Sequence, residues 1–195
     1  MSKKLLKLRL TTLLISIFLI IMISYINPNA KNRVFNQTIE QMNLMSDKKI
    51  YIFSEMHHNY YISGLKMFLD NKLFGVGVKS FQNRCSDPNY FVDYKEYCNK
   101  HPHNTYIQIL SETGIVGGLF LLAILFYFFQ FFFKHLFLKF KGKYFFSDLQ
   151  ICFLSGLAIY LWPFIPTGNL FSNWLNIIMI LNLSLFIWSI KLSKE

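Results

Sequence analysis

The residues best suited to chemistry in this chain are two histidines in the stretch KHPHNTYIQILSETGIVGG, residues 100–118. They are His101 and His103, separated by Pro102. Proline disfavours a helix at the residue before it and is best tolerated where a helix starts, so a helix is expected to begin near His103 or Asn104. A helix N-terminus carries about half a positive charge, which favours a bound anion and disfavours protonation of a nearby imidazole. A neutral histidine beside an anion site is what general-base catalysis requires.

His103 is also expected to share one face of this helix with residues that pack closely. At helical spacing that face contains His103, Ile107, Leu110, Gly114 and Gly117. Gly114 and Gly118 form a G-x-x-x-G pair, which lets a second helix approach, so the three glycines are predicted helix-packing residues. By position alone, His103 would be an interfacial histidine and His101 a loop residue. His57 and His58 would be surface or sugar-contacting residues rather than metal ligands.

The elements around these histidines are too apolar for an ordinary soluble domain. Of the 195 residues, 53% are hydrophobic and 18% aromatic, whereas only 15% are charged. Residues 10–30, 113–133 and 149–190 contain no Asp, Glu, Lys or Arg. A membrane-spanning helix needs about 20 apolar residues, and the third tract is divided by the polar, proline-containing residues 163–173. The sequence therefore predicts an all-α membrane protein with four transmembrane helices and one large, partly helical external loop domain.

The predicted organisation alternates membrane helices with segments on the two sides of the membrane. The transmembrane helices are expected at residues 10–30, 113–133, 149–165 and 174–190. The large external domain is expected at residues 31–112 and a short external loop at 166–173, with residues 1–9, 134–148 and 191–195 in the cytoplasm. This orientation places the short Lys- and Arg-rich segments inside. The net charge of +10 is then explained by topology, and nucleic-acid binding is not expected.

The first apolar run has the basic start of a cleaved signal peptide. It is longer than a usual signal core, and INPNAK, residues 26–31, offers no small-x-small cleavage site. We therefore expect an uncleaved membrane anchor.

The three cysteines agree with this topology. Cys85 and Cys98 fall in the external segment, where an oxidising compartment permits a disulfide, whereas Cys152 lies in the third predicted span and is expected to be a packing residue. A bridge across this short loop would stabilise the external domain by about 3 kcal/mol. The alternatives are two free thiols, or a metal site that adds His101 and His103. The disulfide ranks first because the spacing lacks the C-x-x-C form of structural zinc sites.

Two further features order the external segment. Residues 31–50 are polar and expected to be helical in part. Within residues 51–71, an amphipathic helix is predicted from the spacing of the apolar residues Ile62, Leu65, Phe68 and Leu69. Gly75 and Gly77 then mark a turn or a close backbone approach.

Two stretches of the external segment carry a resemblance to a known family. HNTYIQILSETGIVG has a His–Asn pair, His103 and Asn104, followed by G-x-x-G at Gly114 and Gly117. FLDNKLFGVGVKSF, residues 68–81, contains a Gly-x-Gly and ends in an aromatic residue. Together they resemble the C-terminal part of the O-antigen ligase family, over roughly residues 10–190 of this chain.

This resemblance implies a glycosyl transfer at the outer face of the bacterial inner membrane, with the large loop in the periplasm. Family members move a polysaccharide from an undecaprenyl-pyrophosphate carrier to an acceptor hydroxyl, such as a lipid A-core sugar, without a metal or another cofactor. His103 matches the essential histidine of the family and would be the base. Arg84 and Lys79 are candidates for pyrophosphate contacts on charge and position, and Asn104 is a further candidate substrate-binding residue.

The chain also departs from the family pattern. Family members have many more membrane helices, and an arginine from an earlier external loop helps to hold the pyrophosphate. The sequence is therefore expected to be a truncated product, a remnant, or half of a split enzyme whose partner protein supplies the missing helices. Alternatives within the family are a polymerase and a protein O-oligosaccharyltransferase. Outside catalysis, the alternative is a membrane-anchored protein that binds a glycan or a partner.

Overall fold

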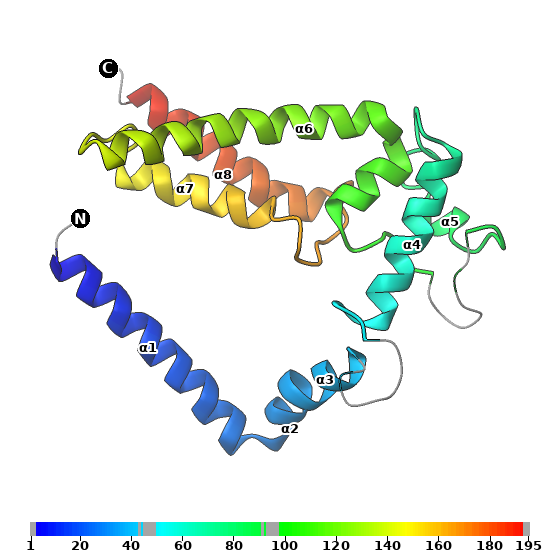
Figure 1. Ribbon diagram of the computed structural model, residues 1–195, viewed down its shortest axis with the longest axis horizontal. Coiled ribbons are helices and arrows are strands. Elements are labelled where there is room, and N and C mark those ends of the chain that lie inside the picture. Colours follow the sequence, from blue (N-terminus) through cyan, green and yellow to red (C-terminus); the bar gives the residue numbers. More distant parts are fainter. Residues whose placement is uncertain (1–2, 43, 45–49, 91, 93–97, 193–195) are drawn as a thin grey trace. The chain divides into compact units, whose positions relative to one another are not determined.

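The computed structural model describes residues 3–42, 44, 50–90, 92 and 98–192 of the chain. Throughout these residues the regular secondary structure is helical (Figure 1). The chain divides into two compact units, Met1–Glu55 and Met56–Glu195. The all-helical architecture agrees with the expected fold class.

The first unit consists of a long apolar helix followed by short helical segments. They are α1 (Lys3–Ile26), α2 (Pro28–Lys31), the π-helix η1 (Asn32–Asn36) and α3 (Gln37–Gln41). The side chain of Asn27 caps α2 by accepting from the N–H groups of Asn29 and Ala30 at 3.0 and 3.2 Å. Pro28 follows at the first helical position, where its missing N–H costs nothing. The polar residues after α1 are thus helical in part, as expected.

The second unit carries the remaining helices. They are α4 (Glu55–Asp70), α5 (Phe81–Arg84), α6 (Thr105–Phe140), α7 (Asp148–Tyr160) and α8 (Asn173–Leu192). A cluster of buried apolar side chains, Phe146, Leu154 and Phe186, joins α7 to α8, and Phe128 and Phe131 of α6 pack against it. Helices α6, α7 and α8 therefore lie side by side (Figure 1).

Helix α7 begins with a capping box between Ser147 and Gln150 and is shorter than the predicted third span. It ends at Tyr160, so residues 161–165 of that span are not helical. Pro163 is the reason, because proline lacks the N–H that a helix needs and disfavours helical geometry in the residue before it.

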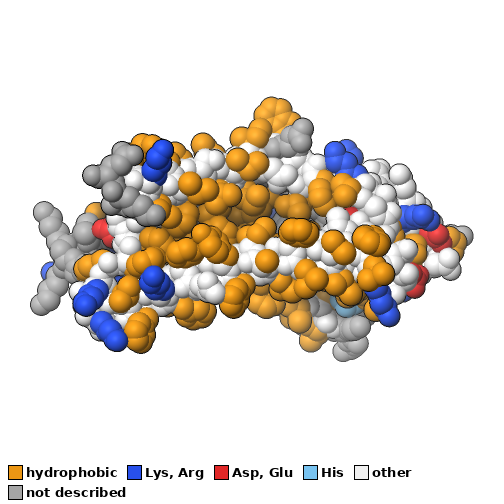
Figure 2. Space-filling model, turned by 90° about the horizontal axis from the view of Figure 1, so that it is seen from above, with side chains coloured by type: hydrophobic (Ala, Val, Ile, Leu, Met, Phe, Trp, Pro, Cys, Tyr) orange, Lys and Arg blue, Asp and Glu red, His pale blue; other side chains and the backbone are white. Residues whose placement is uncertain are grey.

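In the described part of the chain, two helices are long and apolar enough to cross a membrane. They are residues Lys7–Ile26 of α1 and the whole of α6. Helix α7, with 13 residues, is about 20 Å long at ~1.5 Å per residue, whereas a bilayer core is about 30 Å thick. Apolar side chains spread over the face shown in Figure 2, and Phe120, for example, is 72% exposed. These features are consistent with an all-α membrane protein, with two clear candidate spans rather than four.

Helix α4 confirms the helix predicted within residues 51–71, but its buried face is not the predicted apolar stripe. The buried residues are Asn59, Tyr60, Ser63, Gly64 and Met67. Leu65 and Leu69 of the predicted stripe are 42% and 59% exposed. This face is buried because α4 approaches the start of α6 closely at Gly64: a Cβ on Gly64 would lie 2.5 Å from Cγ2 of Ile107.

Helix α6 is bent at Gly114, and its first turns run at an angle to the rest (Figure 1). Gly114 has φ 65° and ψ −157°, a conformation that glycine adopts readily and other residues rarely do. The helical hydrogen bonds are interrupted there, and the loop of residues 72–77 replaces them. Val76 and Gly77 N–H groups donate to the carbonyls of Ser111 and Glu112, while Ile115 and Val116 N–H groups donate to those of Lys72 and Leu73. Gly75 lies at this contact, which confirms the predicted close backbone approach.

The bend corrects the helix-packing role predicted for the glycines. The Cα of Gly114 faces the loop, where a Cβ would overlap the carbonyl of Leu73, and not a second helix. Around Gly117 and Gly118, the nearest described atoms belong to side chains of α6 itself. The predicted face from His103 to Gly117 is also wrong, because His103 precedes the helix and Gly114 interrupts it.

Candidate active site

His103 lies in the tight turn that leads into α6. Its φ of 55° is unusual for a residue other than glycine. The turn is held by a hydrogen bond from the N–H of Thr167 to the carbonyl of His103, at 2.8 Å. Helix α6 itself begins at Thr105, next to the start expected from Pro102. The N-cap Asn104 separates His103 from the first residue of α6, so His103 belongs to the turn and not to the helix.

Asn104 is the N-cap of α6 and is buried. Its Oδ1 accepts from the N–H groups of Tyr106 and Ile107 at 3.0 and 3.1 Å. Its Nδ2 donates to the carbonyl of Pro163 at 2.9 Å. Both ends of the amide are thus used within the chain, and Asn104 acts as the N-cap that ties the start of α6 to Pro163.

Aromatic and histidine rings from separate segments surround His103. Its ring stacks on Tyr60 with centroids 5.5 Å apart, and the ring of His57 lies edge-on at 5.3 Å. Both belong to α4, Tyr60 lying 43 residues and His57 46 residues earlier in the chain. The ring of His101 lies 4.2 Å away. The structure therefore gathers three histidines, of which the sequence predicted a role for one.

This gathering keeps the imidazole of His103 uncharged. Burial, followed by repulsion from His101 and His57, lowers the pKa of His103 to about 4. Burial also lowers the pKa of His57 and that of His101, although the bond of His101 to Thr167 opposes the second shift. His103 is thus neutral at physiological pH, which is the form that can accept a proton.

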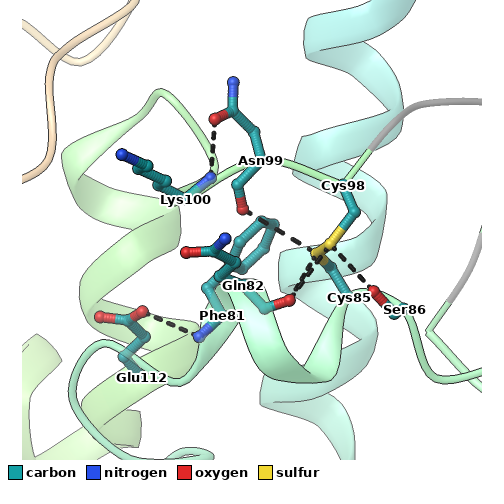
Figure 3. The surroundings of a disulfide bond; sticks show 8 residues. All are labelled: Phe81, Gln82, Cys85, Ser86, Cys98, Asn99, Lys100 and Glu112. Carbon is teal, nitrogen blue, oxygen red and sulfur yellow. Dashed lines mark hydrogen bonds between the residues drawn. A yellow bond between two sulfur atoms is a disulfide. The ribbon is translucent and has the colours of Figure 1, made fainter.

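The segment before His103 is tied to α5 by a disulfide between Cys85 and Cys98, whose Cα atoms are 5.5 Å apart. Figure 3 shows this bond beside Asn99, whose carbonyl oxygen lies 3.9 Å from Sγ of Cys85. The side chain of Asn99 reaches His103, with Nδ2 and Nε2 separated by 2.8 Å. The disulfide thus anchors the residue that contacts the imidazole, and it leaves neither cysteine as a thiolate for the alternative metal site.

Two buried polar residues of α6, which were not among the predicted site residues, connect the helix to neighbouring loops. Glu112 is buried and accepts from the N–H groups of Lys79 and Phe81, both at 3.1 Å (Figure 3 shows the second bond). Gln108 donates to Oδ1 of Asn169 at 2.8 Å. The sequence feature that could have revealed them is an amide and a carboxylate four residues apart at the start of a largely apolar helix. Burying a polar group costs free energy, so such residues usually have a functional or structural role.

The predicted cations are not part of the histidine cluster. Lys79 and Arg84 are exposed, and no contact joins either side chain to a histidine in the described part of the chain. Lys100 is closer to the histidines in the sequence, because it lies between Asn99 and His101. Across the described residues, no group of three or more His, Cys, Asp or Glu side chains is arranged to hold a metal ion.

An apolar cavity of about 510 Å³ opens between α6 and α7. Its walls are Leu125, Phe128, Phe129, Phe132, Leu154, Leu157, Ala158 and residues 161–164, with Tyr106 at the start of α6. Tyr106 donates to the carbonyl of Leu161, and Asn104 to that of Pro163. The cavity wall is therefore hydrogen-bonded to the turn that carries His103.

Comparison with known protein families gives one match. The family model described as O-antigen ligase matches residues 1–122, which include the whole histidine cluster. No curated protein and no solved structure matches the chain.

Proposed function

Because the chain belongs to the O-antigen ligase family, we propose that it acts in the transfer of a glycan from undecaprenyl pyrophosphate to an acceptor hydroxyl at the periplasmic face of the bacterial inner membrane. The family implies lipid-linked glycan substrates in general. The observation that carries the proposal is the neutral His103 in the turn before α6, because this residue is positioned as a proton acceptor at the end of a membrane helix.

In the proposed reaction, the acceptor hydroxyl gives its proton to the imidazole of His103. The hydroxyl oxygen then forms a bond to the anomeric carbon of the glycan, and the bond from that carbon to the carrier phosphate oxygen breaks. The leaving undecaprenyl pyrophosphate takes the bonding electron pair. General-base help of this kind contributes about 10²–10⁴-fold to a rate.

A pKa of about 4 makes His103 a weak base in the free chain. The negative charge of a nearby pyrophosphate favours the imidazolium form and so raises the pKa toward physiological pH. We propose that donor binding in this way strengthens the base when it is needed. Lys79 and Arg84 remain proposed pyrophosphate contacts on their charge, and each is exposed and able to meet a ligand.

The apolar cavity supports a lipid-linked donor. Its lining is almost wholly hydrocarbon and aromatic, which suits an isoprenoid chain, and its wall is bonded to the turn of His103. A carrier lying there would place its pyrophosphate toward the histidines. We also propose that α7 and α8 complete four membrane helices, since the two pack together and both are apolar.

The test is transfer of glycan to the acceptor in membranes that contain the chain as their source of this activity. His103→Ala should lower the rate by about 10²–10⁴-fold with normal protein level and membrane insertion. His58→Ala, which removes a half-buried imidazole from the same external segment, is the matched control and should have little effect.

His101→Ala should fall between the two, because His101 contacts Thr167 and lowers the pKa of His103 without being the base. Undiminished transfer in His103→Ala would refute catalysis. Retained glycan binding with no effect of His103→Ala on transfer would instead favour the non-catalytic alternative, in which the ring cluster binds a glycan.

A further inference from the structure

We infer that Asn99 is a positioning residue that determines which nitrogen of His103 carries the proton. The inference rests on the proposed function, in which His103 is the base. It concerns a residue outside the His–Asn pair, four positions earlier in the chain.

The hydrogen bonds of Asn99 determine the direction of its amide. Its Oδ1 accepts from the N–H of Lys100 at 2.7 Å, so this end of the amide is the oxygen (Figure 3). The other end, Nδ2, lies 2.8 Å from Nε2 of His103 and can only donate. Nε2 is therefore an acceptor without a proton, and the neutral imidazole carries its proton on Nδ1.

The neighbouring histidine has the complementary arrangement. Nε2 of His101 lies 3.3 Å from the carbonyl of Thr167, which can only accept, so Nε2 of His101 holds a proton. Its Nδ1 is then an acceptor, and it is buried with no hydrogen-bond partner among the described residues. The centroids of the two rings lie 4.2 Å apart, so the two imidazoles are neighbours with their protons on different ring nitrogens.

This arrangement has a consequence for catalysis. The lone pair of the base is on Nε2, at the position that the Asn99 amide occupies in the free chain. An acceptor hydroxyl reaches the base by replacing that amide as the donor to Nε2. Asn99 thus keeps the proton off the catalytic nitrogen until the acceptor arrives, and the Cys85–Cys98 disulfide holds Asn99 in place.

The experiment uses the full chain in lipid nanodiscs with ¹⁵N-labelled histidine. The signals of His103 are identified among the five histidines by their loss in His103→Ala. Nitrogen chemical shifts report directly which ring nitrogen is protonated, and they do so without any substrate. In the wild-type chain Nε2 of His103 should give the signal of an unprotonated nitrogen, and a protonated Nε2 would overturn the inference.

Two variants sharpen the test. Asn99→Ala removes the donor, so the Nε2-protonated form of His103 should become populated. Asn99→Asp replaces the donor by a carboxylate that accepts, so Nε2 should become the protonated nitrogen and the pKa of His103 should rise. The groups that face His103 in either variant are His57 and Tyr60 of α4 and His101 of its own loop.

Asn83→Asp is the matched control, because it adds the same charge at an exposed position of α5 and should leave the His103 signals unchanged. Transfer by Asn99→Asp should fall by about 10²–10⁴-fold, close to the loss in His103→Ala, since the catalytic nitrogen no longer has a free lone pair. Unchanged tautomers in Asn99→Ala and Asn99→Asp would overturn the role of Asn99. Undiminished transfer in His103→Ala would overturn the proposed function alone, because the nitrogen shifts are measured without substrate and do not depend on transfer activity.

Discussion

At the scale of single residues, the environment of His103 is unfavourable to positive charge. The ring is partly buried, stacks on Tyr60 and faces two further imidazoles. Burial and the two neighbouring imidazoles favour the neutral ring, which is the form that can act as a base. The site should therefore lose its structure before the membrane helices do when the pH falls.

The segment around His103 should become less stable in acid. The pKa of His103 is about 4 in the folded chain against an ordinary value of 6.5. Between these two values the unfolded segment binds more protons than the folded one, so stability is complete above pH 6.5 and falls as the pH drops toward 4. Hydrogen exchange of residues 98–105 should show declining protection from pH 7 to pH 5.

His103→Gln removes the titrating group and should reduce this decline when the two proteins are compared at each pH, which cancels the intrinsic pH dependence of exchange. His135→Gln would be a poor control, because His135 accepts a hydrogen bond from the N–H of Phe146 in another part of the unit. His58→Gln is the better comparison. Equal declines in His103→Gln and the wild-type chain would contradict the assignment.

At the scale of elements, the bend of α6 places the site. The loop of residues 72–77 inserts its backbone where the helix ladder is broken, and Glu112 from the first part of α6 accepts from the N–H groups before α5. One helix thus provides the N-cap next to His103, the buried carboxylate and the long apolar segment after Gly114. The site residues and the long apolar segment are joined through this one element.

Gly114→Ala should be the most damaging glycine substitution in the described part of the chain. An alanine would keep a positive φ, a strain of about 1–3 kcal/mol, and its Cβ would overlap the Leu73 carbonyl. Gly142→Ala is the matched control, since Gly142 has a similar φ of 72° with nothing within 4 Å of a Cβ. The unfolding free energy should fall clearly more for Gly114→Ala, with faster hydrogen exchange at residues 72–77. Equal losses in the two variants would mean that the loop contact contributes nothing.

At the scale of the whole molecule, the chain combines long apolar helices with a segment that a disulfide joins to the end of α5. The apolar helices α1 and α6 provide two candidate spans, and α7 packs on α8 next to the aromatic residues of α6. The basic residues Lys134, Lys139, Lys141 and Lys143 lie at the far end of α6 from His103. From the positive-inside rule we propose that this end faces the cytoplasm and that the histidines face the periplasm.

The proposed membrane orientation can be tested through Cys85 and Cys98. In intact cells, thiol reagents that do not cross the inner membrane should label Cys85 and Cys98 only after a reductant is added, because the two are bonded to each other and the proposed orientation places them outside. Cys85→Ala should free Cys98 for labelling without reductant and serves as the control. Protease added to spheroplasts should cut between residues 31 and 102. Protection of that segment would reverse the proposed orientation.

The sequence by itself determined the features that depend on local chemistry. Hydrophobic tracts predict α1 and α6, Pro102 and Asn104 predict where α6 begins, and the His–Asn and glycine pattern indicates the family, which the comparison confirms. Each of these signals is contained in about 20 consecutive residues or fewer, because helix propensity, capping and membrane insertion act over that range.

Only the tertiary structure decided which residues meet across the chain. His57 and Tyr60 reach His103 because Gly64 lets α4 pack against Ile107, and the polar face of α4 is buried for the same reason. Gly114 serves a loop rather than a helix because its φ is positive, and no spacing rule reveals the sign of φ. The proton position on His103 depends on Asn99, whose amide direction is determined by a bond to Lys100. Such contacts are selected by packing and hydrogen bonding between distant segments, and the residue pattern within one segment does not specify them.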